Sequence, residues 1–199
     1  MKRDDVMRII SGKYKGRILE GHKIAGTRPT MDRVKESVFA MIQSDIKDSC
    51  CLDLFSGSGN LGIEAISNGA RKVYFVDFNQ ICIETIEKNL RSLKITEEAV
   101  VLKKDYLEAL RYFKERDIKF QIIFLDPPYK YHFMTTILQE LEQFGLLEKD
   151  VKIICESDNQ EQIDTKLKLI KEKKYGSKWI HIYKKENGSL SSSVGGTKN

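Results

Sequence analysis

The chain has 199 residues, 41% of them hydrophobic and 32% charged, which is enough for one well-buried core and too few for two ordinary domains with linkers. No apolar run approaches the roughly 20 residues needed to span a bilayer, and no apolar segment follows the polar residues 1–5, so we expect neither a membrane span nor a secretory signal. We expect a cytoplasmic protein with one main domain at residues 31–184, a basic extension at 1–30 and a disordered tail at 185–199.

The net charge of +5 is unevenly distributed along the chain. Residues 1–35 hold ten basic and four acidic side chains, a net charge of +6, so the remaining residues sum to −1. Such a concentration favours contact with a phosphate backbone, although a solvated basic arm is the alternative. The four cysteines include no Cys-x-x-Cys pair and the three histidines are scattered, so we expect buried thiols and no metal site.

The basic N-terminal region begins with two short β-like runs around a Gly-containing centre at residues 7–19, which predicts a hairpin beside the main sheet. Pro29 biases Arg28 toward an extended conformation, and Thr30 then caps an amphipathic helix. Arg28 and Arg33 flank this helix start, where they either hold a phosphate or stay exposed beside a structural cap. The residues that we predict to contact nucleic acid are Arg8, Lys13, Lys15, Arg17, Arg28 and Arg33.

From residue 50 onward, strand-like runs alternate with helical patterns. The predicted strands are 50–54, 72–76, 99–103, 120–125 and 151–156, and the predicted helices are 60–68, 79–93, 106–116, 132–144 and one near 159–168. This alternation predicts an α/β fold with a parallel sheet covered on both faces. Two further runs, 169–175 and 179–183, flank a short turn and are expected to pair antiparallel.

A glycine turn joins the first predicted strand to its helix. Gly57, Gly59 and Gly62 have the G-x-G-x-x-G spacing of nucleotide-binding turns, a spacing that also occurs where a strand-to-helix corner is purely structural. Asp77 ends the next apolar run, about twenty residues on, where a carboxylate accepts hydrogen bonds from ribose hydroxyls. Asp53 would repel a pyrophosphate but suits a ligand with an ammonium and a sulfonium, so we predict S-adenosylmethionine.

The motif Asp126-Pro127-Pro128-Tyr129 follows the fourth predicted strand. Two consecutive prolines either fix a rigid reactive turn or merely end the strand. In the reactive interpretation, the Asp126 carboxylate and the Pro127 carbonyl orient an exocyclic amine for attack on a methyl sulfonium, and Tyr129 stacks on the base. If the first and fourth strands are neighbours at the point where strand order reverses, this motif and the glycine turn face one crevice.

The residues after the third predicted strand have two interpretations. Asp105 either accepts a hydrogen bond from the adenine amino group, with Tyr106 packing beside the ring, or caps the following helix.

Together these motifs resemble a known family. Residues 53–59, DLFSGSG, with Asp126-Pro127-Pro128-Tyr129 resemble the class I S-adenosylmethionine-dependent amino-methyltransferases. The runs RIISGKYKGR at 8–17 and TRPTMDRVKE at 27–36 narrow the resemblance to RsmD-type 16S ribosomal RNA guanine-N2 methyltransferases. The resemblance covers residues 7–183.

This resemblance implies a Rossmann-like, mostly parallel seven-stranded sheet with an N-terminal β-hairpin extension. It implies that the substrate is a guanine of 16S ribosomal RNA, within the small ribosomal subunit or an assembly intermediate. Asp77 stands where relatives usually have Glu, which affects only the fine geometry. The implied catalytic residues are Asp126, Pro127, Pro128 and Tyr129, and the cofactor-binding residues are Asp53, Phe55, Gly57, Ser58, Gly59, Asn60, Asp77, Phe78, Asp105 and Tyr106.

Three other functions stay open at this point. An amino-methyltransferase acting on adenine N6 or another base in DNA or RNA shares the Asp-Pro-Pro-Tyr motif. A nicotinamide-dependent oxidoreductase shares the glycine spacing, although Asp53 and the Pro-Pro turn argue against it. A non-catalytic RNA-binding module would use the basic extension alone.

Overall fold

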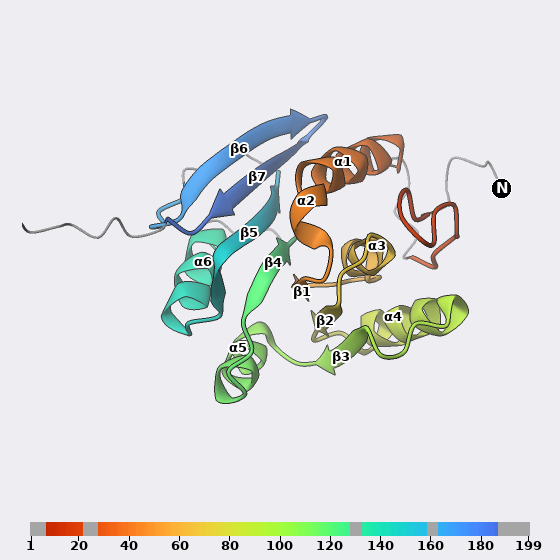
Figure 1. Cartoon of the computed structure of the whole chain (residues 1–199), viewed down its shortest axis with the longest axis horizontal. Coiled ribbons are helices and arrows are strands. Elements are labelled where there is room, and N and C mark those ends of the chain that lie inside the picture. The colour runs from red at the N-terminus through yellow and green to blue at the C-terminus, as the bar shows by residue number, and fades with distance from the viewer. Residues whose placement is uncertain (1–6, 22–27, 128–132, 159–162, 187–199) are drawn as a thin grey trace, which may run out of the picture.

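A single seven-stranded sheet with helices on both faces forms the centre of the molecule (Figure 1). The computed structural model describes residues 7–21, 28–127, 133–158 and 163–186. The strands are β1 (Cys50–Leu54), β2 (Lys72–Asp77), β3 (Ala99–Lys103), β4 (Phe120–Leu125), β5 (Leu147–Ser157), β6 (Lys168–Tyr175) and β7 (Lys178–Lys184). The helices are α1 (Arg28–Met41), α2 (Gln43–Ile46), α3 (Asn60–Ser67), α4 (Gln80–Leu93), α5 (Tyr106–Glu115) and α6 (Phe133–Gln143).

The sheet has the strand order β3-β2-β1-β4-β5-β7-β6. Strands β1 to β5 are parallel, and β7 pairs antiparallel with both β5 and β6, which confirms the predicted fold class. The order reverses between β1 and β4, which lie side by side with Asp53 opposite Phe124 and Leu54 opposite Leu125. Ligands of open α/β sheets bind at such a reversal, beyond the carboxyl ends of the strands.

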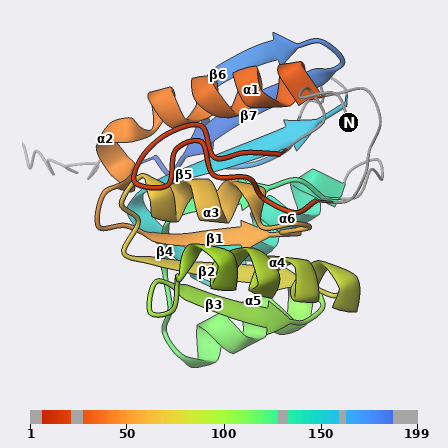
Figure 2. The ribbon, with the colours of Figure 1, turned by 90° about the vertical axis from the view of Figure 1, so that its right-hand side faces the viewer.

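Alternate residues of the strands supply two separate cores. Cys51 of β1 and Phe124 of β4 pack toward α1, α3 and α4, whereas Leu52 and Leu125 pack toward α5 and α6. Both faces of the central strands are therefore buried, which explains why these strands read as continuous apolar runs. Figure 2 shows the two layers, with α1, α3 and α4 on the side of the sheet that faces the viewer.

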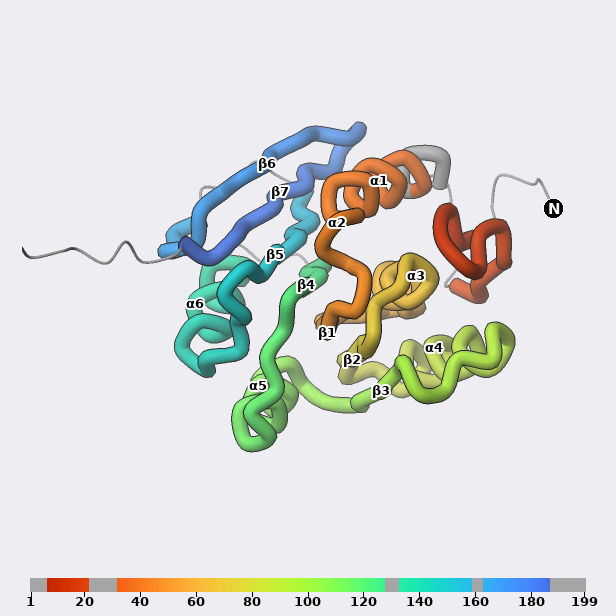
Figure 3. Tube along the Cα trace, viewed as in Figure 1, coloured from red at the N-terminus to blue at the C-terminus, as the bar shows by residue number. Residues whose placement is uncertain are grey.

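The N-terminal arm, which we define as residues 7–21, packs against α3 and α4 (Figure 3). The predicted hairpin is present as a compact antiparallel loop with a single bridge, Arg8 to Ile18, and not as two strands. Three backbone hydrogen bonds join its two halves, from the N–H of Ile9 to Arg17, of Gly16 to Ile9 and of Leu19 to Met7. The amides of Ile10 and Ser11 donate to the Glu64 carboxylate of α3. The arm consequently lies on α3 and not beside the sheet.

Two predictions about helices are wrong. Arg28 is the first residue of α1 and is not extended as predicted, and Thr30 lies within the helix instead of capping it. Proline is tolerated in the first turn of a helix, because the N–H that it lacks would have no partner within the helix. The helix predicted near 159–168 is absent from its described part, residues 163–168, since pairing with β7 draws the chain into β6 from Lys168. Residues 159–162, and most of the tail that we predict to be disordered, lie outside the described residues.

Candidate active site

Three predicted site carboxylates come from three neighbouring strands at the carboxyl edge of the sheet. Asp53 lies near the end of β1, Asp77 ends β2, and Asp126 follows β4. The arrows of the parallel strands point to the same side of the molecule in Figure 2, where the three strand ends meet. The register of β1 and β4 sets Leu54 opposite Leu125, so the glycine turn and Asp126 both begin at this edge, on neighbouring strands.

Asp53 is buried, with only 3% of its surface exposed. Its Oδ2 accepts a hydrogen bond from the backbone N–H of Gly62 at 2.9 Å, which fixes the start of α3 against β1. Burial raises the pKa of Asp53 to about 8, opposed by the bond from Gly62 and reinforced by Asp126 and Asp77. A buried acid beside two other carboxylates holds a negative charge only at a high energetic cost, which a nearby cation lowers.

The glycine turn is tied to the end of β2. Asp77 Oδ2 accepts a hydrogen bond from the N–H of Gly57, and Oδ1 accepts one from Asn79, both at 2.9 Å. Gly57 has a φ of +54°, which favours glycine, and a Cβ placed there would meet nothing within 4 Å. Phe78, which follows Asp77, is 66% exposed. The turn thus offers open space beside a carboxylate and an exposed aromatic ring.

These features fit the predicted cofactor. Among the residues that the structure describes, no lysine or arginine forms an ion pair with Asp53 or Asp77. A ligand with an ammonium and a sulfonium balances that negative charge, whereas a pyrophosphate adds to it. The remaining turn residues make internal contacts: Ser58 Oγ donates to Met7 Sδ at 3.3 Å, and Asn60 Oδ1 accepts from Lys35 at 2.7 Å.

Three aromatic rings gather at the same edge. Phe55, Tyr106 and Phe133 lie with centroids 5.2–5.9 Å apart, and each side chain is half-buried. Phe55 has a φ of +67°, a costly conformation for a bulky side chain that places its ring after β1. Phe133, at the start of α6, was missed by sequence reasoning because its helix is distant in the chain. The rings form an apolar wall suited to an adenine.

Asp105 serves as a helix cap. Its Oδ1 accepts from the N–H of Leu107 at 2.9 Å, and Glu108 accepts from the N–H of Asp105 at 3.4 Å, which together form a capping box at the start of α5. The capping interpretation is therefore confirmed, and contact with adenine stays a prediction.

We call Asp126-Pro127-Pro128-Tyr129 the acceptor motif. Its first residue, Asp126, adjoins a small charged cluster that the sequence did not reveal. Lys178 of β7 places Nζ 3.3 Å from Glu156 Oε1 and 3.0 Å from Asp158 Oδ1, at the end of β5. Asp126 is exposed, yet the protein around it displaces part of its hydrating water, and this desolvation raises its pKa. The positive charge of Lys178 opposes the rise, and the negative charge of Asp158 adds to it. Burial and then Asp126 raise the pKa of Glu156 to about 8. Pro127 is buried, while Pro128 and Tyr129 lie outside the described residues.

The predicted nucleic-acid contacts are not all brought to this edge. Arg8 pairs with Asp32 at 3.0 Å near the start of α1, and Arg33 is exposed on the same helix. Lys13, Lys15 and Arg17 are also exposed, but they lie at the far end of α3 and α4. The side chain of Arg28 is outside the described part of the structure.

The position of the arm tip follows from its contacts with the C-terminal ends of these helices. The N–H of Lys13 donates to the Ser67 carbonyl at 2.7 Å, and Arg17 donates to the Ser92 carbonyl at 3.1 Å. Helix α3 has eight residues, so the tip lies about 12 Å from the glycine turn along its axis.

No group of three or more His, Cys, Asp or Glu side chains in the described part of the chain is arranged to hold a metal ion. No helix there is long and apolar enough to cross a membrane.

Comparison with known proteins gives a consistent family. The family described as "Conserved hypothetical protein 95" matches residues 7–184. YlbH of Bacillus subtilis, provisionally named an rRNA methyltransferase, is 40% identical over 182 residues, covering 90% of this chain and 99% of that protein. Ribosomal RNA small subunit methyltransferase D of Haemophilus influenzae is 34% identical over 180 residues, covering 89% of this chain and 93% of that protein.

Among solved structures, the Escherichia coli protein yhhF superimposes with a TM-score of 0.78 at 29% identity, covering 91% of this chain and 98% of that one. Fold, site geometry and sequence similarity agree over nearly the whole length, and the chain belongs to the RsmD family of methyltransferases.

Proposed function

We propose that the protein transfers a methyl group from S-adenosylmethionine to the exocyclic N2 amine of a guanine in 16S ribosomal RNA. The observation that carries this proposal is the meeting of Asp53, Asp77 and Asp126 at the point where the strand order reverses between β1 and β4. The small ribosomal subunit, or an assembly intermediate of it, is the proposed partner, in keeping with the name of the Haemophilus influenzae relative.

The cofactor supplies a methyl group on a positively charged sulfur; its transfer to nitrogen forms an N–C bond and breaks a C–S bond, whose electron pair stays on sulfur. An aromatic amine is a poor nucleophile because its lone pair is delocalised. Asp126 accepts a hydrogen bond from the amine, and the Pro127 carbonyl accepts the second, so the lone pair is directed at the methyl group. As positive charge develops on nitrogen, the carboxylate of Asp126 takes the proton.

The electrostatics of the site serve this role. The raised pKa of Asp126 makes its carboxylate a better proton acceptor than an ordinary surface aspartate. Lys178 opposes that rise. Base access requires that the guanine be turned out of its stack, as enzymes that modify bases do.

The test is methyl transfer from radiolabelled S-adenosylmethionine to small ribosomal subunits that lack the modification, followed by digestion to nucleosides. We expect label in N2-methylguanosine. Asp126→Asn should reduce kcat by at least about a hundredfold while cofactor affinity stays within twofold, because the proton acceptor is lost and the cofactor contacts are kept. Asp150→Asn, an exposed acid in the early part of β5 at the opposite edge, is the matched control.

Label in N6-methyladenosine or another nucleoside would show that the acceptor is not guanine N2. An equal loss of kcat and cofactor affinity in Asp126→Asn would refute the assignment of Asp126 as the proton acceptor.

A further inference from the structure

The segment 166–185, which we call the basic ribbon, is a second concentration of positive charge that the average charge of the chain hides. It contains β6, β7 and their turn, and holds eight lysines against one acidic residue, Glu172, for a net charge of +7. Since the chain totals +5 and residues 1–35 carry +6, everything else sums to −8. The excess positive charge of this protein therefore lies in two places, not one.

Lysines on an edge strand have an ordinary structural explanation. Strand β6 ends the sheet, every residue of it from Lys168 to Lys174 is exposed, and charged edge strands resist pairing with other chains. Protection of the edge explains why β6 contains lysines. It does not explain why the turn between β6 and β7 lies at the carboxyl edge of the sheet, or why side-chain contacts hold that turn in place.

The turn of the ribbon lies at the edge of the sheet that carries the candidate active site. Strand β7 is antiparallel to both β5 and β6, so β6 runs in the same direction as the parallel strands and ends at their carboxyl edge, as Figure 2 shows. Lys178, the first residue of β7, forms ion pairs with Glu156 near the end of β5 and with Asp158 just after it. It also interacts electrostatically with Asp126. The hydroxyl of Tyr175 hydrogen-bonds to Ser37 of α1. The turn is thus held between α1 and the acceptor motif.

The two lysines before the turn rest on aromatic rings. Lys173 Nζ lies 4.9 Å from the centre of the Tyr175 ring, and Lys174 Nζ lies 5.4 Å from the centre of the Trp179 ring. Successive residues of a strand point to opposite faces, so these ammonium groups border the crevice edge on both faces of the ribbon. Contact with a ring restrains each flexible side chain, which lowers the entropy lost when it binds an anion.

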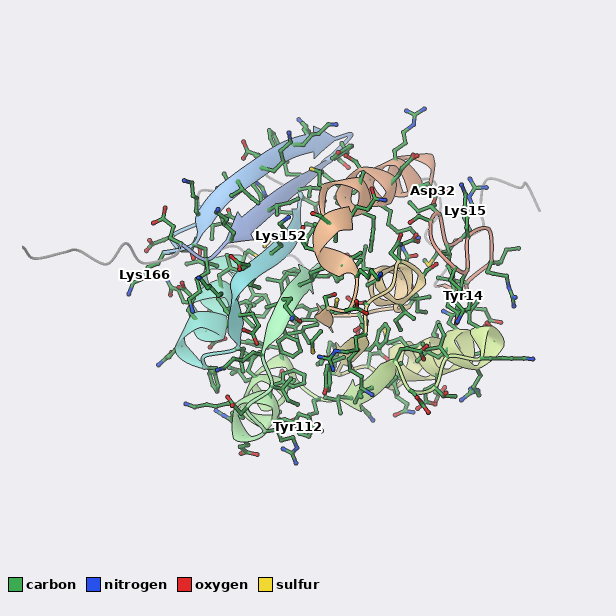
Figure 4. The ribbon with its side chains drawn as sticks, in the orientation of Figure 1. Tyr14, Lys15, Asp32, Tyr112, Lys152 and Lys166 are labelled. Atoms are coloured by element: carbon green, nitrogen blue, oxygen red, sulfur yellow. The ribbon has the colours of Figure 1, made fainter. Side chains whose placement is uncertain are left out.

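The predicted contacts on the N-terminal arm do not occupy this position. Figure 4 shows Tyr14 and Lys15 of the arm tip far from Lys166, which starts the ribbon at the end away from its turn. The N–H of Tyr14 donates to Ser67 at the C-terminal end of α3, so the arm tip lies toward the amino edge of the sheet, whereas the ribbon turn lies at the carboxyl edge. Lys178, at the ribbon turn, interacts electrostatically with Asp126, so the turn and not the arm tip adjoins the proposed position of the target base.

We propose that the turn of the basic ribbon binds the RNA backbone next to the target base, with Lys173 and Lys174 contacting phosphates. This inference rests on the proposed function, since it concerns the same RNA and the same crevice. The partner is a single-stranded or locally opened segment of RNA, because the base must leave its stack to reach Asp126.

The test compares two doubly substituted proteins with the same change of charge. Lys173→Gln/Lys174→Gln removes two cations at the ribbon turn, and Lys47→Gln/Lys149→Gln removes two exposed cations at the opposite edge of the sheet. Binding to a 16S ribosomal RNA transcript is measured at a series of KCl concentrations, and methyl transfer is measured with the small-subunit substrate. Circular dichroism verifies that both variants are folded.

Loss of two single-strand phosphate contacts should reduce the slope of log K against log salt by about 1.4 in the ribbon variant. Its KM for RNA should rise about tenfold with kcat and cofactor affinity unchanged, since only positioning contacts are removed. The control variant should keep the wild-type slope and KM. An equal loss in both variants, or no change in the ribbon variant while the wild-type protein methylates RNA, would overturn the inference and leave the proposed function intact. Absence of RNA methylation by the wild-type protein would refute the proposed function itself.

Discussion

Replacing Lys35 by methionine should release the N-terminal arm and loosen the glycine turn together. Lys35 of α1 is 3% exposed, and its Nζ lies 2.9 Å from Glu64 Oε2, 2.7 Å from the Arg8 carbonyl and 2.7 Å from Asn60 Oδ1. An ammonium has three N–H donors, so each has a partner. Arg8 belongs to the arm, Glu64 to α3, and Asn60 follows the glycine turn. One buried cation therefore joins the arm to the candidate cofactor site.

The magnitude follows from what the substitution leaves behind. Removing one partner of a buried ion pair costs about 3–5 kcal/mol because the other charge remains buried without compensation. Glu64 keeps hydrogen bonds from the amides of Ile10 and Ser11, at 2.8–3.2 Å, and from the Ser11 hydroxyl at 2.8 Å. Because these donors still stabilise the carboxylate, we expect the lower end of that range, about 3 kcal/mol of unfolding free energy.

Urea unfolding followed by circular dichroism measures this loss, and calorimetric titration measures cofactor affinity. Lys88→Met is the matched control, since Lys88 pairs with Glu20 of the same arm at 2.6 Å but both side chains are more than half exposed; it should cost less than about 1 kcal/mol. Adding Glu64→Gln to Lys35→Met should cost less than the sum of the two single changes, because the buried pair is then replaced by neutral groups. A cost for Lys35→Met equal to that of Lys88→Met, or unchanged cofactor affinity, would refute the coupling.

Three further outcomes are expected. Gly12 has a φ of +75°, and a Cβ added there would lie 1.9 Å from a backbone oxygen of α3, so Gly12→Ala should lower the unfolding free energy by about 2–4 kcal/mol in the urea assay. Gly16 has a φ of +83° but nothing lies within 4 Å of its added Cβ, so Gly16→Ala should cost only about 1 kcal/mol. The pKa of Asp53 is raised from 3.8 to about 8, so this residue keeps a proton near pH 7 in the folded, ligand-free protein. Binding of the cationic cofactor should release that proton, which calorimetry in buffers of different ionisation enthalpy measures, and Asp53→Asn should abolish the release. Stability should also fall as pH rises from about 4 to about 8 in the wild type and less in Asp53→Asn, since the unfolded chain loses this proton first. Lys178 lowers the pKa of Asp126, so Lys178→Met should move the acidic limb of the pH–rate profile to higher pH, and Lys178→Arg should leave it in place.

The central sheet could be predicted from sequence because its strands are buried on both faces. Strand β4, Phe120–Leu125, has its predicted bounds, since a parallel strand covered on both faces must be apolar throughout. The site could be predicted for the same reason. A carboxylate that ends or directly follows an apolar strand, as Asp77 and Asp126 do, has to lie at the carboxyl edge of the sheet, so its position in the sequence gives its position in the fold.

The arm and the charged residues around the site could not be predicted in this way. The arm does not join the sheet, and its position is set by Glu64 and Ser67 on a helix more than fifty residues along the chain. Lys35 looks like an ordinary helix-surface lysine until the arm covers it. Lys178 follows a glycine turn in a lysine-rich segment, and nothing local distinguishes it from Lys174. These roles depend on contacts between distant segments, which periodicity does not report.

An acidic crevice that receives RNA faces an electrostatic conflict. The carboxylates of Asp53, Asp77 and Asp126 suit a cationic cofactor and a proton-donating amine, but they repel the phosphates on either side of the base. Cations within a Debye length, about 8 Å at physiological ionic strength, offset that repulsion, whereas those about 12 Å away along α3 are largely screened. The arm tip therefore contributes to general attraction of RNA, while local compensation has to come from groups near the β4 and β5 ends. If the ribbon turn provides it, its contribution to RNA affinity should persist at salt concentrations that abolish the contribution of Lys13 and Lys15.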